Sequence, residues 1–393
     1  MKTRETMNRQ RMWFWMAALI VSLGLLYAAT GHADANEPAK EIVSASGVSH
    51  GLCCMVGGAG SELPVALAEA SGLLVHVIDG DASAVQAGRE AATKKGLGIK
   101  RVLIERADAS PLSHADSTLD LLLVPETSKE ILSKLASAEV LRALRPQGKA
   151  MFRLREGCGV SRVTLEDWAK QSSLKLTPLD KALDTWFVLA KPAISGVDDW
   201  SHWEHGPDNN PVSTDTVIKA PYMTQWMAEP YYIAMPAITT AAGGRTFVAM
   251  GHIAHHEREE AWLNTLLARN GYNGAELWRK RLPDGYLVHR SAFIATDDVF
   301  YMIDPGGQGC LLLNPETGDE AGRVRVPEVR GEWKWIAMAG GTLFGLAGEK
   351  NDPPQTTLVR SKYPAWSWGE LSKGYYEQPQ IPWGFGETVF AYD

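Results

Sequence analysis

The chain has 393 residues, of which 45% are hydrophobic, 22% charged and 9% aromatic, and its formal net charge is −7. This composition excludes a disordered or collagen-like protein and leaves room for two globular domains. An acidic chain without a basic patch is a poor nucleic-acid binder, because phosphate neutralisation supplies most of that affinity. Four cysteines are too few for a disulfide scaffold.

Residues 1–35 predict an export segment. Four basic residues precede an apolar run over residues 12–29, and Ala33-Asp34-Ala35 provides a small-x-small cleavage site. A retained membrane anchor is the alternative, because 18 residues is near the lower limit for crossing a bilayer. Either way we expect the rest of the chain to reach the periplasm or cell envelope, with the membrane contacted only through this segment. Cleavage would remove four basic and two acidic residues and leave a net charge of −9.

Residues 44–192 alternate short apolar runs with helix-like stretches. Strands are predicted at 52–56, 73–78, 101–105, 119–124 and 149–154, and helices at 63–70, 82–94 and 130–144. The last strand follows a Pro146-Gln147-Gly148 turn. This alternation predicts an α/β fold with right-handed crossovers and a parallel sheet, whose ligand crevice lies at the carboxyl ends of the strands.

Three sequence features fall at that crevice. They are the glycine-rich turn Gly57-Gly58-Ala59-Gly60-Ser61, the Asp79 that ends the second strand, and Asp108 after the third. Glycines let the backbone approach a ligand, and a carboxylate in the place of Asp79 can accept both ribose hydroxyls. The pattern therefore favours an adenosine-containing ligand.

The ordered set of motifs resembles the class I S-adenosylmethionine-dependent methyltransferases over about 150 residues. The set comprises the glycine turn, Asp79, Ala107-Asp108, Ser117-Thr118-Leu119-Asp120, and the segment 139–148 that ends in Pro146-Gln147-Gly148. The resemblance implies S-adenosylmethionine (SAM) as cofactor, with Gly57, Gly58, Ala59 and Gly60 at its methionine part, Asp79 at the ribose and Asp108 at the adenine amino group.

The chain departs from that family at the turn. Met55 stands where the family has an acidic residue. The second and third glycines of the family fall on Ala59 and Ser61, or on Gly60 and Glu62 in the register shifted by one. In the first register we expect the Ala59 methyl group to narrow the backbone approach. No motif for a methyl acceptor is found. Cys53 and Cys54 are adjacent, as in the strained disulfide of some quinoprotein dehydrogenases, but they fall in the first buried strand, which favours a packing role.

A different composition begins after the predicted α/β domain. Residues 193–232 are expected to form a linker, and residues 233–393 are rich in glycine, proline and tryptophan, which predicts an all-β domain. The segment 266–280 has a strand, an Asn/Gly turn and a strand with a tryptophan, and 310–320 repeats the pattern 44 residues later. Further hairpins are predicted at 292–303, with the turn at Asp297-Asp298, and at 335–346, with the turn at Gly340-Gly341.

Repeats of about 40 residues with four short strands are typical of a β-propeller. These segments resemble the pyrroloquinoline-quinone-like (PQQ-like) propeller repeats of quinoprotein dehydrogenases and of cofactor-free envelope scaffolds. About three repeats and the start of a fourth are present, and the last residues, 388–393, look like the third strand of a blade. We therefore expect an incomplete propeller in a fragment of a longer protein, with an unpaired edge strand.

Histidines cluster at His202, His205 and near His252. Two histidines beside carboxylates can bind a transition metal, but spacing identifies no third ligand, so loop residues at a domain junction are the favoured interpretation and no metal site is predicted. No calcium-ligand set for a quinone is identified either, and PQQ is not expected.

The whole pattern resembles exported bacterial proteins that join a methyltransferase-like Rossmann domain to a PQQ-like propeller. Three hypotheses follow. The first is a SAM-dependent methyltransferase-type module on a propeller platform in the cell envelope. The second is a non-enzymatic scaffold with a degenerate methyltransferase fold and a propeller that binds an envelope protein or glycan. The third and least favoured is a PQQ-dependent dehydrogenase.

Overall fold

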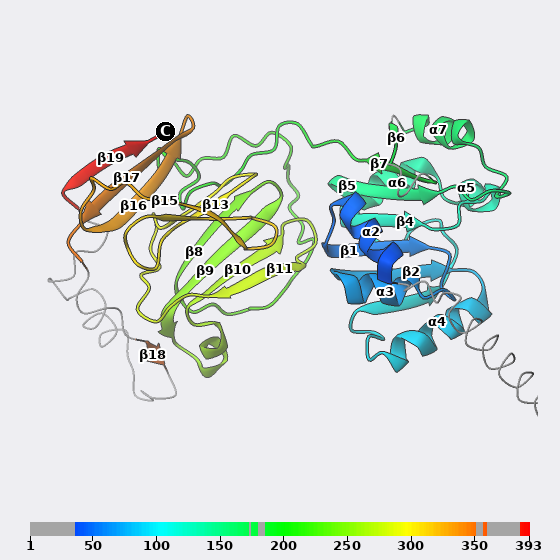
Figure 1. The fold of residues 1–393 in the computed structure, drawn as a ribbon, viewed down its shortest axis with the longest axis horizontal. Helices are drawn as coiled ribbons and strands as arrows, with labels where there is room; N and C mark the ends of the chain where they lie inside the picture. The colour runs from blue at the N-terminus through cyan, green and yellow to red at the C-terminus, as the bar shows by residue number, and fades with distance from the viewer. Residues whose placement is uncertain (1–35, 173, 180–184, 351–356, 360–385) are drawn as a thin grey trace, which may run out of the picture.

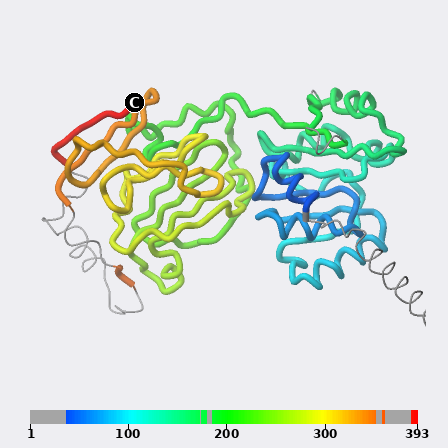
Figure 2. Tube along the Cα trace, in the orientation of Figure 1, coloured from blue at the N-terminus to red at the C-terminus, as the bar shows by residue number. Residues whose placement is uncertain are grey.

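The computed structural model describes residues 36–172, 174–179, 185–350, 357–359 and 386–393. The chain forms an α/β half and a β half, joined by a long connection without regular helices or strands (Figures 1 and 2). The predicted export segment, residues 1–35, lies outside the described residues. Among the residues described, no helix combines the length and apolarity needed to cross a membrane.

One seven-stranded sheet organises the α/β half, with strand order β3-β2-β1-β4-β5-β7-β6. Its strands are β1 (His50–Val56), β2 (Gly72–Asp79), β3 (Val102–Arg106), β4 (Leu119–Val124), β5 (Leu144–Arg153), β6 (Leu176–Pro178) and β7 (Trp186–Ala190). The strands β1 to β5 are parallel and have the 3-2-1-4-5 order of a doubly wound Rossmann-type sheet. The predicted α/β fold is therefore confirmed for this half.

Helices cover both faces of the sheet (Figure 1). They are α2 (Asn36–Ser46), α3 (Leu63–Ala70), α4 (Ala82–Lys94), α5 (Lys129–Lys134), α6 (Ser137–Ala143) and α7 (Arg162–Lys170). The predicted bounds of α3, α4 and β4 agree with the structure. Alternate residues of β1 divide between two apolar cores, with Cys53 and Met55 in one and Cys54 and Val56 in the other.

The single helix predicted over residues 130–144 is wrong, because the chain forms α5 and α6 there instead. Leu135 and Ala136 between them have extended backbone, with ψ of 97° and 140°. Leu135 is fully buried, and its carbonyl accepts a hydrogen bond from the indole of Trp168 at 2.9 Å. The tertiary contact with α7 thus replaces the helical hydrogen bonds that local sequence would favour.

At one edge the sheet also has two strands that were not predicted, β7 and β6. The strand β7 pairs antiparallel with β5, and β6 pairs antiparallel with β7. The predicted turn at Pro146-Gln147-Gly148 lies inside β5, where Gln147 has a positive φ of 62° and the pairing with β4 shifts register. A bulge, rather than a turn before the strand, accommodates these residues.

The described residues of the β half form three sheets, in which all strand pairs but one are antiparallel. The first contains β8 (Met235–Ala242), β9 (Arg245–Ala254), β10 (Thr265–Asn270) and β11 (Glu276–Arg281), with the short β18 (Leu358–Val359) paired parallel to β9. The second contains β12 (Phe293–Ala295), β13 (Phe300–Ile303), β14 (Cys310–Leu313) and β15 (Glu320–Val324). The third contains β16 (Glu332–Ala339), β17 (Thr342–Gly348) and β19 (Thr388–Tyr392).

The predicted hairpins of this half are confirmed. The strand pairs β10–β11, β12–β13, β14–β15 and β16–β17 are all antiparallel. Gly340 and Gly341, which form the last turn, both have positive φ, as a two-residue hairpin turn requires. Most of the predicted start of a fourth repeat, residues 360–385, lies outside the described residues.

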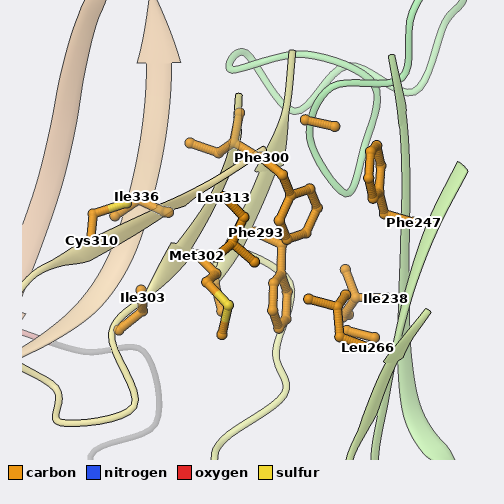
Figure 3. Close-up of a cluster of buried hydrophobic side chains, with 14 of the residues drawn as sticks. Ile238, Phe247, Leu266, Phe293, Phe300, Met302, Ile303, Cys310, Leu313 and Ile336 are labelled. Carbon is orange, nitrogen blue, oxygen red and sulfur yellow. The ribbon is translucent and has the colours of Figure 1, made fainter. Parts of the chain in front are cut away.

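A single apolar core links the three sheets of the β half. Figure 3 shows Phe247 of β9, Phe293 of β12 and Phe300 of β13 pointing toward one another. The ring centroids of Phe247 and Phe300 are 4.6 Å apart, and Ile336 of β16 belongs to the same core. Each of the three sheets therefore buries apolar side chains against its neighbours.

The carboxylate of Asp120, at the start of β4, joins the two halves. Asp120 is 1% exposed, and its Oδ1 accepts a hydrogen bond from Asn270 Nδ2 at 2.6 Å. Its Oδ2 accepts from Asn273 Nδ2 at 2.7 Å and from the Leu52 backbone N–H at 2.8 Å. Arg145 completes the set with an ion pair to the same carboxylate. The Asn/Gly turn between β10 and β11 is thus held against the end of the sheet opposite the carboxyl ends of the parallel strands.

Candidate functional site

A cavity of about 1110 Å³ lies at the carboxyl ends of the parallel strands. The sheet order reverses between β1 and β4 at this place, which is where open α/β sheets bind ligands. The lining comes from the loops that follow β1, β2, β3, β4 and β5, and includes Gly57, Gly58, Gly60, Asp79, Asp108, Glu126, Ile131, Lys134, Arg155 and Cys158. Of the six residues predicted to bind a cofactor, five therefore line one cavity.

The glycines of the turn are required by backbone conformation and close packing. Gly57 and Gly58 have φ of 79° and 74°, in the left-handed region that favours glycine. A Cβ on Gly58 would lie 3.1 Å from Pro125 Cγ, and one on Gly60 would lie 3.3 Å from Ala84 Cα. Bare backbone therefore faces the cavity at Gly57 and Gly58.

Ala59 does not line the cavity. Its side chain is fully buried in the apolar core beneath the turn. A Cβ on Gly88 of α4 would clash with the Ala59 carbonyl oxygen, so the turn packs directly on that helix. The expectation that the Ala59 methyl group narrows the ligand approach is therefore wrong, because the methyl group points away from the cavity wall.

Asp79 supports the turn and still has acceptor capacity. Its Oδ2 accepts a hydrogen bond from the Ala59 N–H at 3.0 Å, and its Oδ1 accepts from the Asp81 N–H at 2.9 Å. An ionised carboxylate has about four acceptor positions, so about two remain. The carboxylate can therefore organise the backbone and accept the two hydroxyls of a ribose.

Asp108 is engaged more loosely. Its side chain is 74% exposed, and its Oδ1 lies 3.5 Å from Lys134 Nζ. Lys134 also forms an ion pair with Glu130 at 2.9 Å, and the hydrogen bond that Lys134 donates to this carboxylate raises the pKa of the lysine. Because solvent screens an exposed pair of this kind, a ligand can displace Lys134 from Asp108.

The charge of the cavity wall selects among ligands. Six carboxylates line it, against two cationic side chains, Lys134 and Arg155. The formal charge of the lining is therefore −4, and Arg155 is itself paired with Glu126 at 3.1 Å. Phosphate groups would be repelled by this wall, whereas a cationic ligand would be attracted.

Sequence reasoning missed the wall that faces the glycine turn. It consists of Glu126, Thr127 and Ser128 after β4, and of residues 155–158 after β5. No motif marks these residues, but both segments follow predicted strands, so the rule for strand carboxyl ends could have located them. Cys158 is half-buried there, and its Sγ donates to the Val160 carbonyl at 3.3 Å.

The other singled-out residues of β1 lie in the core. Met55 is fully buried, so the position at which the family has an acidic side chain carries none here and does not reach the cavity. Cys53 and Cys54 are both buried free thiols, as the packing interpretation predicted. Burial raises the pKa of Cys54 to about 12, which keeps this thiol protonated.

The histidines at the start of the connection make structural hydrogen bonds. His202 Nε2 accepts from the Met338 N–H at 3.1 Å, and His205 Nε2 lies 2.8 Å from Asp198 Oδ2. These contacts agree with the favoured interpretation of loop residues at a junction. Within the described ranges, no group of three or more His, Cys, Asp or Glu side chains is arranged to hold a metal ion.

No protein-family model and no curated protein matches this chain. Solved structures match part of this chain. A protein from Methanococcus maripaludis, assigned as an S-adenosyl-L-methionine-dependent methyltransferase, has 16% identity and a TM-score of 0.35, covering 41% of this chain and 87% of its own. A SAM-dependent methyltransferase from Aquifex aeolicus has 18% identity and a TM-score of 0.32, covering 39% and 87%.

A TehB-like SAM-dependent methyltransferase from Corynebacterium glutamicum is a further match, with 15% identity and a TM-score of 0.33. This similarity covers 45% of this chain and 97% of that protein. All three similarities concern the fold alone and cover less than half of this chain.

Proposed function

We propose that the cavity of the α/β half binds S-adenosylmethionine, as a methyltransferase-type module. The observation that carries the proposal is the cavity of about 1110 Å³ at the reversal of strand order, where bare glycine backbone, Asp79 and Asp108 meet. Gly57 and Gly58 would lie along the methionine part, Asp79 would accept the ribose hydroxyls, and Asp108 would accept from the adenine amino group.

The charge of the lining supports this ligand over other adenosine compounds. SAM carries a cationic sulfonium centre, and when bound it supplies a methyl group to a nucleophile. Dinucleotides and ATP carry phosphates, which the net charge of −4 on the wall disfavours. The Rossmann-type fold by itself does not distinguish these ligands.

Calorimetric titration of the full chain with SAM and S-adenosylhomocysteine tests the proposal. We expect a dissociation constant in the micromolar range, or about 8 kcal/mol, that Asp79→Ala abolishes. Glu90→Ala is the matched control, because it removes the same charge from exposed surface on α4 outside the cavity. Circular dichroism of both variants verifies that they fold. Binding that survives in Asp79→Ala would contradict the assigned ribose contact.

A second candidate is a non-enzymatic scaffold with a degenerate site. Met55 favours it, since the cavity lacks the carboxylate that the family places there for the ligand ammonium group. Lys134 beside Asp108 favours it too, because it occupies the predicted adenine contact. A folded chain that binds neither ligand at millimolar concentration would select this function.

We infer further that the β half serves as a PQQ-like propeller platform in the cell envelope. A five-stranded and a four-stranded sheet around a common core, and the predicted export segment, support this inference. A quinone-dependent dehydrogenase remains the least favoured function. Fractionation of cells that express the full chain tests the location, and a quinone absorbance in the purified protein would contradict the cofactor-free platform.

A further inference from the structure

A second cavity, the tryptophan slot, lies beside β8 in the β half. Its volume is about 350 Å³, within the range of about 300–1,000 Å³ that is usual for small-ligand sites. The described residues that line it are Trp200, Trp203, Ala237, Thr239, Thr240 and Ala241. Two half-buried indoles and one strand therefore enclose enough space for a small organic ligand.

The slot lies where the outer edge of β8 loses its partner. Trp200 and Ala241 exchange two backbone hydrogen bonds of 2.8 Å on the side of β8 that faces away from β9. Backbone groups alternate in direction along an antiparallel strand, so the N–H and C=O of Thr239 point to the same side as those of Ala241. Among the described residues Thr239 has no backbone partner on that side, because the chain turns away and the next carbonyl, of Ser201, accepts from Ala295 of β12 at 2.9 Å. The slot therefore has a backbone donor and acceptor beside its two indoles.

Both indoles are held in place by the surrounding structure. Trp200 Nε1 donates to the Trp203 carbonyl at 2.9 Å, and the Trp200 ring packs edge-on against His205 with 5.3 Å between the ring centroids. The guanidinium of Arg290 lies over the Trp203 ring, 4.2 Å from its centroid. An aromatic wall that is already ordered lowers the entropic cost of binding a ligand.

Charge restricts the ligands that the slot can take. None of the described residues that line it is charged, so no lining side chain would compensate the desolvation of an anion. A quaternary ammonium group can bind between aromatic rings, but the positive charge of Arg290 on Trp203 would repel it. The slot therefore fits a neutral ligand.

The free edge of β8 is too short to take up a peptide strand. Trp200 already pairs with Ala241, and Pro236 has no N–H, so the outward backbone groups left are those of Ala237 and Thr239. Strands usually run over about five or six residues. A ligand that combines apolar faces with a few separate hydrogen-bonding groups fits better than an extended peptide.

We propose that the tryptophan slot binds a neutral sugar. A pyranose ring has apolar C–H faces that pack on indoles, and hydroxyl groups that both donate and accept hydrogen bonds. The backbone and hydroxyl of Thr239 would pair with those hydroxyl groups, and Trp200 and Trp203 would pack on the ring. The proposal is independent of whether the cavity of the α/β half binds SAM.

Calorimetric titration of the full chain with maltose, cellobiose and N,N′-diacetylchitobiose tests the proposal. We expect at least one of these neutral disaccharides to bind with a dissociation constant of about 1 mM or below. Trp203→Ala should weaken that binding at least tenfold. The matched control is Trp262→Ala, because Trp262 is also half-buried, with the guanidinium of Arg279 4.2 Å from its ring centroid, but lies outside the slot.

A second variant covers the case in which Trp203→Ala does not fold. Thr239 is exposed and valine has nearly the same shape, so Thr239→Val should keep the wild-type circular dichroism and weaken sugar binding at least threefold. Three results would overturn the proposal. They are no binding of any of the three sugars at about 20 mM, binding that neither slot variant weakens more than Trp262→Ala does, and tighter binding of the deacetylated, cationic chitobiose than of any neutral sugar.

Discussion

Replacing the buried Asp120 with asparagine should destabilise the protein, because this carboxylate holds the two halves together. The Asp120 side chain is 1% exposed. Its carboxylate accepts hydrogen bonds from Leu52, Asn270 and Asn273 and forms an ion pair with Arg145. An amide keeps the shape but turns an NH₂ group toward donors and leaves Arg145 without its counter-charge. Breaking one partner of a buried pair costs about 3–5 kcal/mol. Arg145 is 20% exposed and partly hydrated, so we expect about 3 kcal/mol.

Urea unfolding followed by circular dichroism and by tryptophan fluorescence measures this loss. The contacts from Asn270 and Asn273 also predict coupling between the halves, because each is a hydrogen bond to a charged group, worth about 1.5–3 kcal/mol. A double-mutant cycle of Asp120→Asn with Asn273→Ala should give a coupling energy above about 1 kcal/mol. A loss below about 1 kcal/mol for Asp120→Asn, or additive effects in the cycle, would refute the reasoning.

Three further predictions concern the cavity and the junction. Gly88→Ala should lower the free energy of unfolding by about 1–3 kcal/mol and weaken SAM binding, because a Cβ at this position clashes with the Ala59 carbonyl. Gly80→Ala is the control, because its Cβ has open space, and it should lower the free energy of unfolding by less than half as much. Equal losses of the two variants in urea unfolding would contradict this prediction. NAD and ATP should bind at least tenfold more weakly than SAM in calorimetry, and the difference should shrink in high salt; tighter nucleotide binding would contradict the electrostatic argument. Burial lowers the pKa of His202 to about 4. This imidazole is therefore protonated near pH 6.5 in the unfolded chain but only near pH 4 in the folded chain. Stability should therefore fall as the pH drops from 6.5 toward 4, with a smaller slope in His202→Gln, and an unchanged slope would show that other groups cause the loss.

Local patterns in the sequence determined most elements of both halves. The alternation of apolar runs and helical stretches located β1, β2, β4, α3 and α4, since these elements depend on periodicity over a few residues. The hairpin turn at Gly340-Gly341 follows from the positive φ that only glycine adopts without strain. The glycine turn and Asp79 located the cavity, because strand ends in a parallel sheet share one edge.

Other features depend on residues that are distant in the sequence, and only the tertiary structure decided them. The break between α5 and α6 requires Trp168, 33 residues after Leu135. The Ala59 methyl group points into the core because α4 packs on the turn at Gly88. Asp120 and Asn270 are 150 residues apart, and the sequence around either residue does not predict their hydrogen bond. A short window records what a backbone prefers, whereas the partner of a buried carboxylate or carbonyl is fixed only when the whole chain has folded.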